Sequence, residues 1–485
     1  MIGSLLHWWN GLLAPWSALF ITGEWIIRIV MLLVVPFRRS PDAARGWLLL
    51  VFFEPVLGLT LYLIIGRPTP PRWRAVRFRQ LPAALAPTIE RLRRSATVLR
   101  PDMGPALAPI IALAERLGTI PITGGNQAEI LTDYLATIER LVAEIDAATH
   151  HVHLLFYIFA DDDVGGRVIE ALQRASGRGV QCRVLIDSVG SKPWRRTVLH
   201  RLVAAGVQAH AVLPVGPLRR RAGRIDLRNH RKIAVMDGRV GYTGSLNIVN
   251  PDFKPGLTYE ELMVRVTGPV TLALQFLFAG DWYVETGELL DDVAIFPAPV
   301  AEGAVAAQAL PSGPLYPHAN NQWLITALVH SACTRVVITT PYFVPDAPLL
   351  QAVQTAVLRG AEVHLVVPGQ DDQLLVTLAQ KSYYGELLDA GVRIHRYQPR
   401  FLHAKHVTID DQVSWIGSSN MDVRSFVLNE EVVLLFYDRQ LTAQLVREQQ
   451  RYFRDSHPLT ADQWRRRPRR TRIVQNLARL LSPLL

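Results

Sequence analysis

The segment His230–Asp237 has the sequence HRKIAVMD, and the segment His403–Asp410 has the sequence HAKHVTID. Both contain the string His-x-Lys-x4-Asp, and in both a Gly-Ser-x-Asn tetrapeptide begins seven residues after the aspartate, at Gly244 and at Gly417. One such string can arise by chance. Two copies, each followed by the same tetrapeptide at the same spacing, indicate a duplicated functional unit.

Each string closes a β-α-β pattern that occurs twice in the chain. The expected strand, helix and strand are Val152–Phe159, Gly165–Ser176 and Gln181–Asp187 in the first half, and Arg335–Val344, Leu349–Leu358 and Glu362–Val367 in the second. Strands alternating with helices predict an α/β fold of two similar repeats, each a mostly parallel sheet flanked by helices. We expect repeats at 116–290 and 315–458, a Pro-rich linker at 291–314, and motif strands that meet at a pseudo-twofold axis.

The spacing within each string places its basic groups together. Alternate residues of a strand face the same side, so His230 should point with Lys232, and His403 with Lys405. Imidazole is a nucleophile and an acid or base near neutral pH, and an ammonium group stabilises phosphoryl oxygens. The tetrapeptides add hydroxyl and amide donors for the same oxygens, namely Ser245, Asn247, Ser418 and Asn420.

Two such sets facing each other favour double displacement at phosphorus. One histidine attacks to form a phosphohistidine, the other protonates the leaving alkoxide, and the second then deprotonates the incoming alcohol. The strings contain no carboxylate cluster suited to Mg²⁺, so neither a metal nor a cofactor is expected. Asp237 and Asp410 complete the strings and are grouped with the catalytic residues. Because each lies past the strand, a structural hydrogen-bonding role is the stronger interpretation for both. Tyr157, Tyr342 and Phe343 lie near strand ends and could border the pocket, although core packing is the stronger interpretation for each taken singly.

The N-terminal residues hold much of the apolar excess of a chain that is 49% hydrophobic and 19% charged. Two apolar runs, at about 16–37 and 46–66, each approach the ~20 residues that cross a bilayer, so we expect a membrane anchor of two transmembrane helices within residues 1–67. Glu24 and Arg28 are spaced to pair on one helix face. Two buried core helices are the alternative. A signal peptide is disfavoured, because residues 1–14 contain no Lys or Arg.

The net charge of +10 favours anionic partners, a membrane surface or nucleic acid. Arginines that follow the second run outnumber those between the runs, which favours a cytoplasmic catalytic body. Residues 68–115 are expected to be a basic, Pro-rich linker with one helix near Thr88–Ser95, and residues 459–485 a basic amphipathic tail suited to an anionic membrane or docked on the body. A second basic cluster precedes the first motif and could hold anionic headgroups or be a solvated loop. It comprises Arg219, Arg220, Arg221, Arg224 and Arg228.

The duplicated string resembles the signature of the phospholipase D superfamily. The segments Arg228–Lys232, Asp187–Ser191 and Gly417–Phe426, the two N-terminal runs and the tail look like those of bacterial cardiolipin synthases of that superfamily. The resemblance implies a bacterial inner-membrane phosphatidyltransferase that joins two phosphatidylglycerol molecules into cardiolipin and releases glycerol.

The resemblance also implies roles for individual residues. His230, Lys232, His403 and Lys405 would be catalytic, with His230 the nucleophile because the N-terminal motif usually supplies it. Asn247 and Asn420 would line the phosphate pocket. Glu261 and Glu431, on the strand after each motif, would orient the histidines. The family usually has Trp-Arg-Asp where this chain has Tyr259-Glu260-Glu261.

Three other functions remain open at this stage. A phospholipid hydrolase, or a transferase for another phosphatidyl alcohol, would use the same phosphohistidine. A membrane-anchored nucleic-acid phosphodiesterase would suit the positive charge, although two membrane spans have little use in a nuclease. A scaffold with an inactive site is disfavoured, because all six motif residues are intact. We therefore expect an anionic phospholipid, and not nucleic acid, as the partner.

Overall fold

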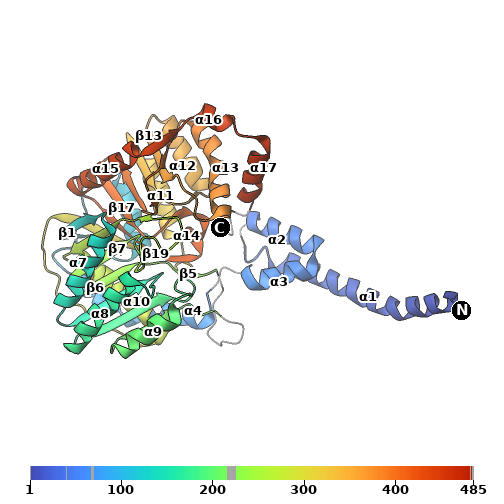
Figure 1. The fold of residues 1–485 in the computed structure, drawn as a ribbon, viewed down its shortest axis with the longest axis horizontal. Helices are drawn as coiled ribbons and strands as arrows, with labels where there is room; N and C mark the ends of the chain where they lie inside the picture. Colours follow the sequence, from blue (N-terminus) through green and yellow to red (C-terminus); the bar gives the residue numbers. More distant parts are fainter. Residues whose placement is uncertain (1, 40, 67–69, 216–225, 481, 483–485) are drawn as a thin grey trace. The chain divides into compact units, whose positions relative to one another are not determined.

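The computed structural model describes residues 2–39, 41–66, 70–215, 226–480 and 482. The chain forms two compact units, an N-terminal unit within Met1–Thr69 and a body made of Pro70–Gly223 and Leu227–Leu485. In Figure 1 the body runs from blue at α4 (Arg72–Ala84) through teal and green in the first repeat to yellow and red in the second. Most of the arginine cluster before the first motif, at 219–224, lies outside the described residues.

The N-terminal unit consists of helices α1 (Ile2–Val34), α2 (Pro41–Phe53) and α3 (Pro55–Ile65). The ion pair expected between Glu24 and Arg28 is present, with 3.2 Å between Oε2 and Nη1. The second apolar run is not one helix, because α2 ends before Glu54 and Pro55, which has no amide hydrogen, begins α3. Within the described ranges, no helix is both long and apolar enough to cross a membrane, so the two expected transmembrane helices are not confirmed.

The segment after the N-terminal unit contains the expected helix near Thr88–Ser95, as α5 (Ala86–Arg93), and has more helical structure than a linker. It also forms helices α4 (Arg72–Ala84) and α6 (Ala108–Gly118). Helix α4 packs on α10 (Val270–Thr286), and the side chain of Arg74 is only 1% exposed. The Pro- and Arg-rich composition concealed this packing, because the buried arginine is paired with carboxylates of the body.

The first repeat combines a parallel set of strands with an antiparallel set. Its parallel strands are β2 (His151–Phe156), β3 (Gln181–Asp187) and β4 (Gln208–Val212), and its antiparallel strands are β6 (Ile233–Met236), β7 (Val240–Gly244) and β9 (Met263–Thr267). Its helices are α7 (Tyr134–Ala147), α8 (Asp163–Gly177), α9 (Arg195–Ala204) and α10. The predicted β-α-β unit is therefore present, with strand β3 at the predicted bounds.

The second repeat has the same order of elements. Its parallel strands are β11 (Arg335–Thr339), β13 (Glu362–Pro368) and β14 (Arg393–Tyr397), and its antiparallel strands are β16 (His406–Ile409), β17 (Val413–Gly417), β19 (Asn429–Phe436) and β20 (Ser456–Leu459). Its helices are α11 (Asn320–Ser331), α12 (Ala347–Leu358), α13 (Leu374–Ala390) and α15 (Arg439–Arg454).

The two repeats share one mixed sheet, so the expectation of two mostly parallel sheets is wrong. Strand β1 (Thr123–Leu131) pairs with β9 and with β10 (Val305–Ser312), and β10 pairs with β19. Strand β10 therefore occupies much of the expected linker. The motif strands run antiparallel because short turns join them, as at Asp237 and Gly238, where both φ angles are positive.

Short strands tie the two repeats together beside the motif histidines. Strand β5 (Arg228–Asn229) pairs in parallel with β19, and β8 (Tyr259–Glu260) pairs in parallel with β15 (Phe401–Leu402). In the second repeat, β12 (Phe343–Val344) pairs with β18 (Met421–Asp422), which leads into α14 (Val423–Val427). Each motif therefore begins where its own repeat meets the other.

The C-terminal tail forms helices α16 (Ala461–Arg465) and α17 (Arg469–Arg479). Helix α17 lies against α13 (Figure 1), where Arg479 pairs with Glu386 at 3.2 Å. The opposite side of α17 is apolar and exposed at Ile473, Val474, Leu477 and Leu480. The tail is thus docked on the body and still presents an apolar stripe.

Candidate active site

The two motif histidines line one cavity of about 600 Å³ in the body. His230 follows β5, and its amide donates to the carbonyl of Glu430 in the second repeat at 2.8 Å. His403 follows β15, and its amide donates to the carbonyl of Glu260 in the first repeat, also at 2.8 Å. The backbone of each motif is thus fixed by the other repeat, and the predicted meeting of the two motifs is present.

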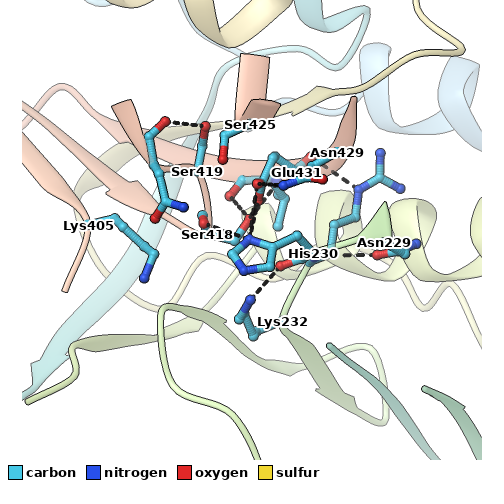
Figure 2. Close-up of polar contacts among 12 residues, drawn as sticks. Asn229, His230, Lys232, Lys405, Ser418, Ser419, Ser425, Asn429 and Glu431 are labelled. Carbon is cyan, nitrogen blue, oxygen red and sulfur yellow. Dashed lines mark hydrogen bonds and ion pairs between the residues drawn. The ribbon is translucent and has the colours of Figure 1, made fainter. Parts of the chain in front are cut away.

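Each histidine is also hydrogen-bonded to a glutamate of the opposite repeat. Nδ1 of His230 lies 3.0 and 3.1 Å from the two carboxylate oxygens of Glu431, and Nδ1 of His403 lies 2.7 Å from Oε1 of Glu261. Figure 2 shows the ring of His230 between Glu431, Ser418 and Lys232. Because Nδ1 of both rings is engaged by carboxylate, Nε2 is the nitrogen left for substrate.

Burial keeps both imidazoles neutral when the cavity is empty. It lowers the pKa of His230 to about 4, because Glu431 only partly offsets burial and Lys232 adds to its effect. Burial and the positive charges of Lys405 and Lys232 lower the pKa of His403 well below its usual value. The adjacent carboxylates therefore do not produce an imidazolium in either pair.

The two glutamates differ in charge. Burial opposes ionisation of Glu431, but His230, Lys232 and Ser418 together lower its pKa, so it is a carboxylate. Burial raises the pKa of Glu261 to about 7 despite Lys405, and its Oε2 has no hydrogen-bond partner in the described part of the chain. Glu261 can therefore hold a proton at neutral pH where Glu431 cannot.

The two carboxyl groups would favour different tautomers of the histidines. An ionised Glu431 would accept a hydrogen bond from Nδ1–H of His230 and leave Nε2 with a lone pair. A protonated Glu261 would donate to Nδ1 of His403, which would place the ring proton on Nε2.

The motif lysines lie behind the histidines, inside the protein. Nζ of Lys232 donates to the carbonyl of His230 at 2.7 Å, and Nζ of Lys405 donates to the carbonyl of His403 at 2.5 Å. Burial lowers the pKa of Lys232 to about 7 and that of Lys405 to about 8. A phosphate in the cavity would favour the charged form of both lysines.

The asparagines and the serines of the two Gly-Ser-x-Asn tetrapeptides have different roles. Asn247 and Asn420 line the cavity, and Oδ1 of Asn420 has no partner among the described residues. Ser245 and Ser418, which we expected to bind substrate, are fully buried and do not line the cavity. Ser418 donates to Oε2 of Glu431 at 2.5 Å, and Ser245 bonds the backbone of Leu262, because each serine bridges its strand to the neighbouring one.

Asp237 and Asp410 do not reach the cavity, so their grouping with the catalytic residues needs correction. Asp237 accepts hydrogen bonds from the amides of Thr149, His150 and His151, which lead into β2. Asp410 accepts from the amides of Cys333, Thr334 and Arg335, which lead into β11. Each aspartate therefore fastens its motif hairpin to the adjacent strand.

A buried ionic network supports the strands that carry His230 and Glu431. Arg74 of α4 donates to Oε1 of Glu430 at 2.8 Å and also pairs with Glu285. Asn229 donates to Oε2 of Glu430 at 2.8 Å and to Asp281, whose carboxylate also pairs with Arg231 at 2.6 Å. The network fixes Asn229 and Glu430, the residues directly before His230 and Glu431.

Of the three aromatic residues that could border the pocket, Tyr157 and Tyr342 line the cavity and Phe343 does not. Sequence reasoning missed several other residues of the cavity. Arg228, from the expected basic cluster, lines it and pairs with Asp187 at 3.2 Å, so it is not part of a solvated loop. The missed cavity residues include a cluster around Asp372, whose members come from both repeats. A single acidic residue in a loop has no spacing pattern by which the sequence could indicate it.

Comparison with known proteins places this site in a family. The family model described as "Cardiolipin synthase, PLD-like domain" matches residues 141–282 and 325–453, which contain both motifs. Cardiolipin synthase A of Serratia proteamaculans is 36% identical over 480 residues, which cover 97% of this chain and 98% of that protein. Cardiolipin synthase A of Yersinia pseudotuberculosis is 35% identical over 481 residues, with the same coverage of both chains.

The chain belongs to the cardiolipin synthase family of phospholipase D-like enzymes. A solved structure, the phosphatidylserine synthase of Haemophilus influenzae, has a TM-score of 0.58 at 16% identity and covers 78% of this chain and 100% of its own. That likeness concerns the fold alone. The family is thus the one that the sequence motifs resembled, and its duplicated string corresponds here to two motif hairpins in one sheet.

Proposed function

We propose that this phosphatidyltransferase moves a phosphatidyl group from one phosphatidylglycerol to a hydroxyl of a second, which yields cardiolipin and free glycerol. The observation that carries the proposal is the reciprocal arrangement of His230 and His403 in one cavity, each bonded to a glutamate of the opposite repeat. The relatives named cardiolipin synthase A match nearly the whole chain and supply the substrate class.

In the first step, Nε2 of His230 attacks the phosphorus of the donor lipid. The bond between phosphorus and the glycerol oxygen breaks, and that oxygen takes the proton from Nε2 of His403. Nδ1 of His403 receives a proton from Glu261 in compensation, so the His403 ring stays neutral. The phosphorylated His230 ring keeps its Nδ1 proton, and the Glu431 carboxylate balances its positive charge. The raised pKa of Glu261 supports this direction of proton movement, and with it the nucleophilic role of His230.

In the second step, the acceptor hydroxyl gives its proton to Nε2 of His403, and Nδ1 returns a proton to Glu261. The new oxygen–phosphorus bond forms as the bond from phosphorus to Nε2 of His230 breaks. Lys232 and Lys405 neutralise the charge that gathers on the phosphoryl oxygens, and Asn247 and Asn420 supply amide donors at the cavity wall. No step needs a divalent cation, because the lysines provide the positive charge.

The N-terminal unit is proposed to lie in lipid, in a bacterial membrane. This unit leaves many large apolar side chains exposed; Phe37, in the turn after α1, is 89% exposed, and Phe53, at the end of α2, is 80% exposed. Such a surface is unfavourable in water and favourable in hydrocarbon. An anchor of this kind would hold the enzyme where its phospholipid substrates are.

The test is incubation of the purified full-length protein with phosphatidylglycerol vesicles, with and without EDTA. We expect one glycerol released per cardiolipin formed, and the same rate in EDTA. Phosphatidic acid without cardiolipin would indicate a hydrolase instead. Cleavage of a DNA oligonucleotide, with no lipid product, would support the phosphodiesterase alternative.

A further inference from the structure

A cluster of polar side chains from both repeats lies at the His403 side of the cavity. Oδ2 of Asp372 accepts hydrogen bonds from the hydroxyl of Tyr342 at 2.7 Å, from Nζ of Lys254 at 2.9 Å and from the hydroxyl of Tyr259 at 3.2 Å. All four residues line the cavity. The ring of Tyr259 packs edge-on against His403, with 5.4 Å between the ring centroids, so the cluster adjoins the proposed acid–base histidine.

Only one of the two carboxylate oxygens of Asp372 accepts hydrogen bonds from the described residues. Its side chain is 2% exposed, and Oδ1 has no hydrogen-bond partner among the residues that the structure describes. A buried carboxylate oxygen without a donor is costly, whereas a ligand hydroxyl would complete it. Burial and Asp372 raise the pKa of Tyr342 and Tyr259, so both phenols stay protonated and keep donating to Oδ2.

Asp187, the buried acid at the end of β3 in the first repeat, has all of its hydrogen-bonding capacity used. It is the last residue of β3, whereas Asp372 lies in a loop four residues after the end of β13. Oδ1 of Asp187 accepts from the amides of Val189 and Gly190 at 2.8 and 2.9 Å and from Arg228 at 3.2 Å, and Oδ2 accepts from the amide of Asn229 at 3.0 Å. Asp187 does not line the cavity. The two acids are therefore unlike, because Asp372 presents a carboxylate oxygen to the cavity that a ligand hydroxyl could reach and Asp187 does not.

Cationic side chains also line the cavity. Lys192, Arg228 and Arg424 suit a phosphate, whereas Lys254 is paired with Asp372. A carboxylate repels phosphate oxygens but accepts hydrogen bonds from hydroxyl groups. The chemistry of the Asp372 cluster thus fits the neutral polyol of a headgroup, and its place beside His403 is where an alcohol must lie to exchange a proton with that ring.

We propose that Asp372, held by Tyr342, Tyr259 and Lys254, is the subsite for the glycerol headgroup, first of the leaving glycerol and then of the acceptor lipid. One headgroup hydroxyl donates to Oδ1 of Asp372, while the reacting hydroxyl gives its proton to Nε2 of His403. The phosphorus–Nε2 bond of His230 breaks as the new phosphorus–oxygen bond forms. This inference rests on the proposed function and adds the residue that selects glycerol over water.

The test compares products of full-length Asp372→Asn with those of wild type and of Asp371→Asn. Asp371 is the adjacent acid; it is 45% exposed, pairs with Lys381 at 2.7 Å and lies outside the cavity lining. On phosphatidylglycerol vesicles, the ratio of cardiolipin to phosphatidic acid should fall about tenfold or more in Asp372→Asn, since a hydrogen bond to a charged group is lost. The ratio should not change in Asp371→Asn.

Two soluble acceptors sharpen the test. Labelled glycerol should enter phosphatidylglycerol much more slowly in Asp372→Asn, whereas transfer to ethanol, which has no second hydroxyl for Oδ1, should be nearly unchanged. Tyr342→Phe removes one donor to the same carboxylate with little change in volume, and should lower the glycerol-to-ethanol ratio by a smaller factor. This second variant keeps the test decisive if Asp372→Asn does not fold.

Parallel loss of every product in both variants, with unchanged ratios, would overturn the proposal and leave Asp372 a purely structural residue. Equal effects of Asp371→Asn and Asp372→Asn would overturn it as well. Failure of the proposed function is a separate result, because it would appear in the wild type as phosphatidic acid without cardiolipin.

Discussion

Nδ1 of His403 lies 2.7 Å from Oε1 of Glu261, although the two residues belong to opposite repeats. In the same way, His230 of the first repeat is hydrogen-bonded to Glu431 of the second. Neither repeat therefore contains a complete histidine–glutamate pair of its own, and the chemistry requires both repeats in one sheet. This exchange of partners between the repeats also lets the two pairs differ, because Glu431 is held by Ser418 whereas Oε2 of Glu261 lacks a partner in the described residues.

Replacement of Glu261 by Gln should remove a pH dependence from the first step. Burial raises the pKa of Glu261 to about 7, and Lys405, Lys232 and His230 are the charged groups that act on it. The protonated, donating form is thus present below about pH 7 and is lost as the pH rises through that value. We expect wild-type glycerol release in a single turnover to decrease above about pH 7. The Glu261→Gln variant should release glycerol more slowly at all pH values, and its rate should not change with pH above about pH 7. An unchanged falling limb in the variant would assign that limb to another group.

Replacement of Arg74 by Met should destabilise the body strongly. The variant leaves the buried carboxylates of Glu430 and Glu285 without the charge of Arg74, and such a change typically costs about 3–5 kcal/mol. Arg94→Met is the matched control, because Arg94 forms an exposed pair with Glu90 that should contribute at most about 1 kcal/mol. Denaturant unfolding of the detergent-solubilised protein measures both. Equal stability of the two variants would contradict the importance of the buried network.

Replacement of Asp237 by Ala should reduce stability and leave the chemistry in place. The carboxylate bonds three backbone amides and the Thr149 hydroxyl, far from the cavity lining. Its loss should cost about 1–3 kcal/mol. Turnover per folded molecule, measured well below the unfolding temperature, should stay close to that of wild type. Complete loss of turnover in a folded Asp237→Ala protein would return this residue to the catalytic set.

The N-terminal unit should keep the protein in the membrane. We expect full-length protein to resist extraction by alkaline carbonate, because the exposed apolar side chains of α1, α2 and α3 would lie in lipid. A variant without residues 2–66 should leave the membrane more readily while it still acts on detergent-dispersed lipid. Release of the full-length protein by carbonate alone would contradict the anchor.

The sequence predicted those features that leave a periodic or repeated pattern. The duplicated string identified His230 and His403, and the alternation of strands and helices gave β3 at its observed bounds. The turn at Asp237-Gly238 is a hairpin signal that should have predicted antiparallel motif strands, and this signal was overlooked.

Other features have no pattern in the chain. The sequence places Glu261 and Glu431 after the motifs but cannot tell which histidine each one contacts, because strand pairing between repeats is a tertiary property. Arg74 lies among Pro and Arg residues that resemble a linker, and only its burial against Glu430 distinguishes it. Asp372 is the second of two adjacent loop acids, and its partners come from two other parts of the chain, 254–259 and Tyr342.

The most direct test of the account is detection of the covalent intermediate by acid quench with radiolabelled phosphatidylglycerol. Wild type should carry labelled phosphohistidine at position 230, and His230→Asn should carry none. His403→Asn should stop turnover yet form the intermediate slowly from a phosphatidyl ester of a good leaving group, which needs no proton. Label in His230→Asn but not in His403→Asn would reverse the roles of the two histidines. No label in the wild type under any condition would contradict double displacement itself.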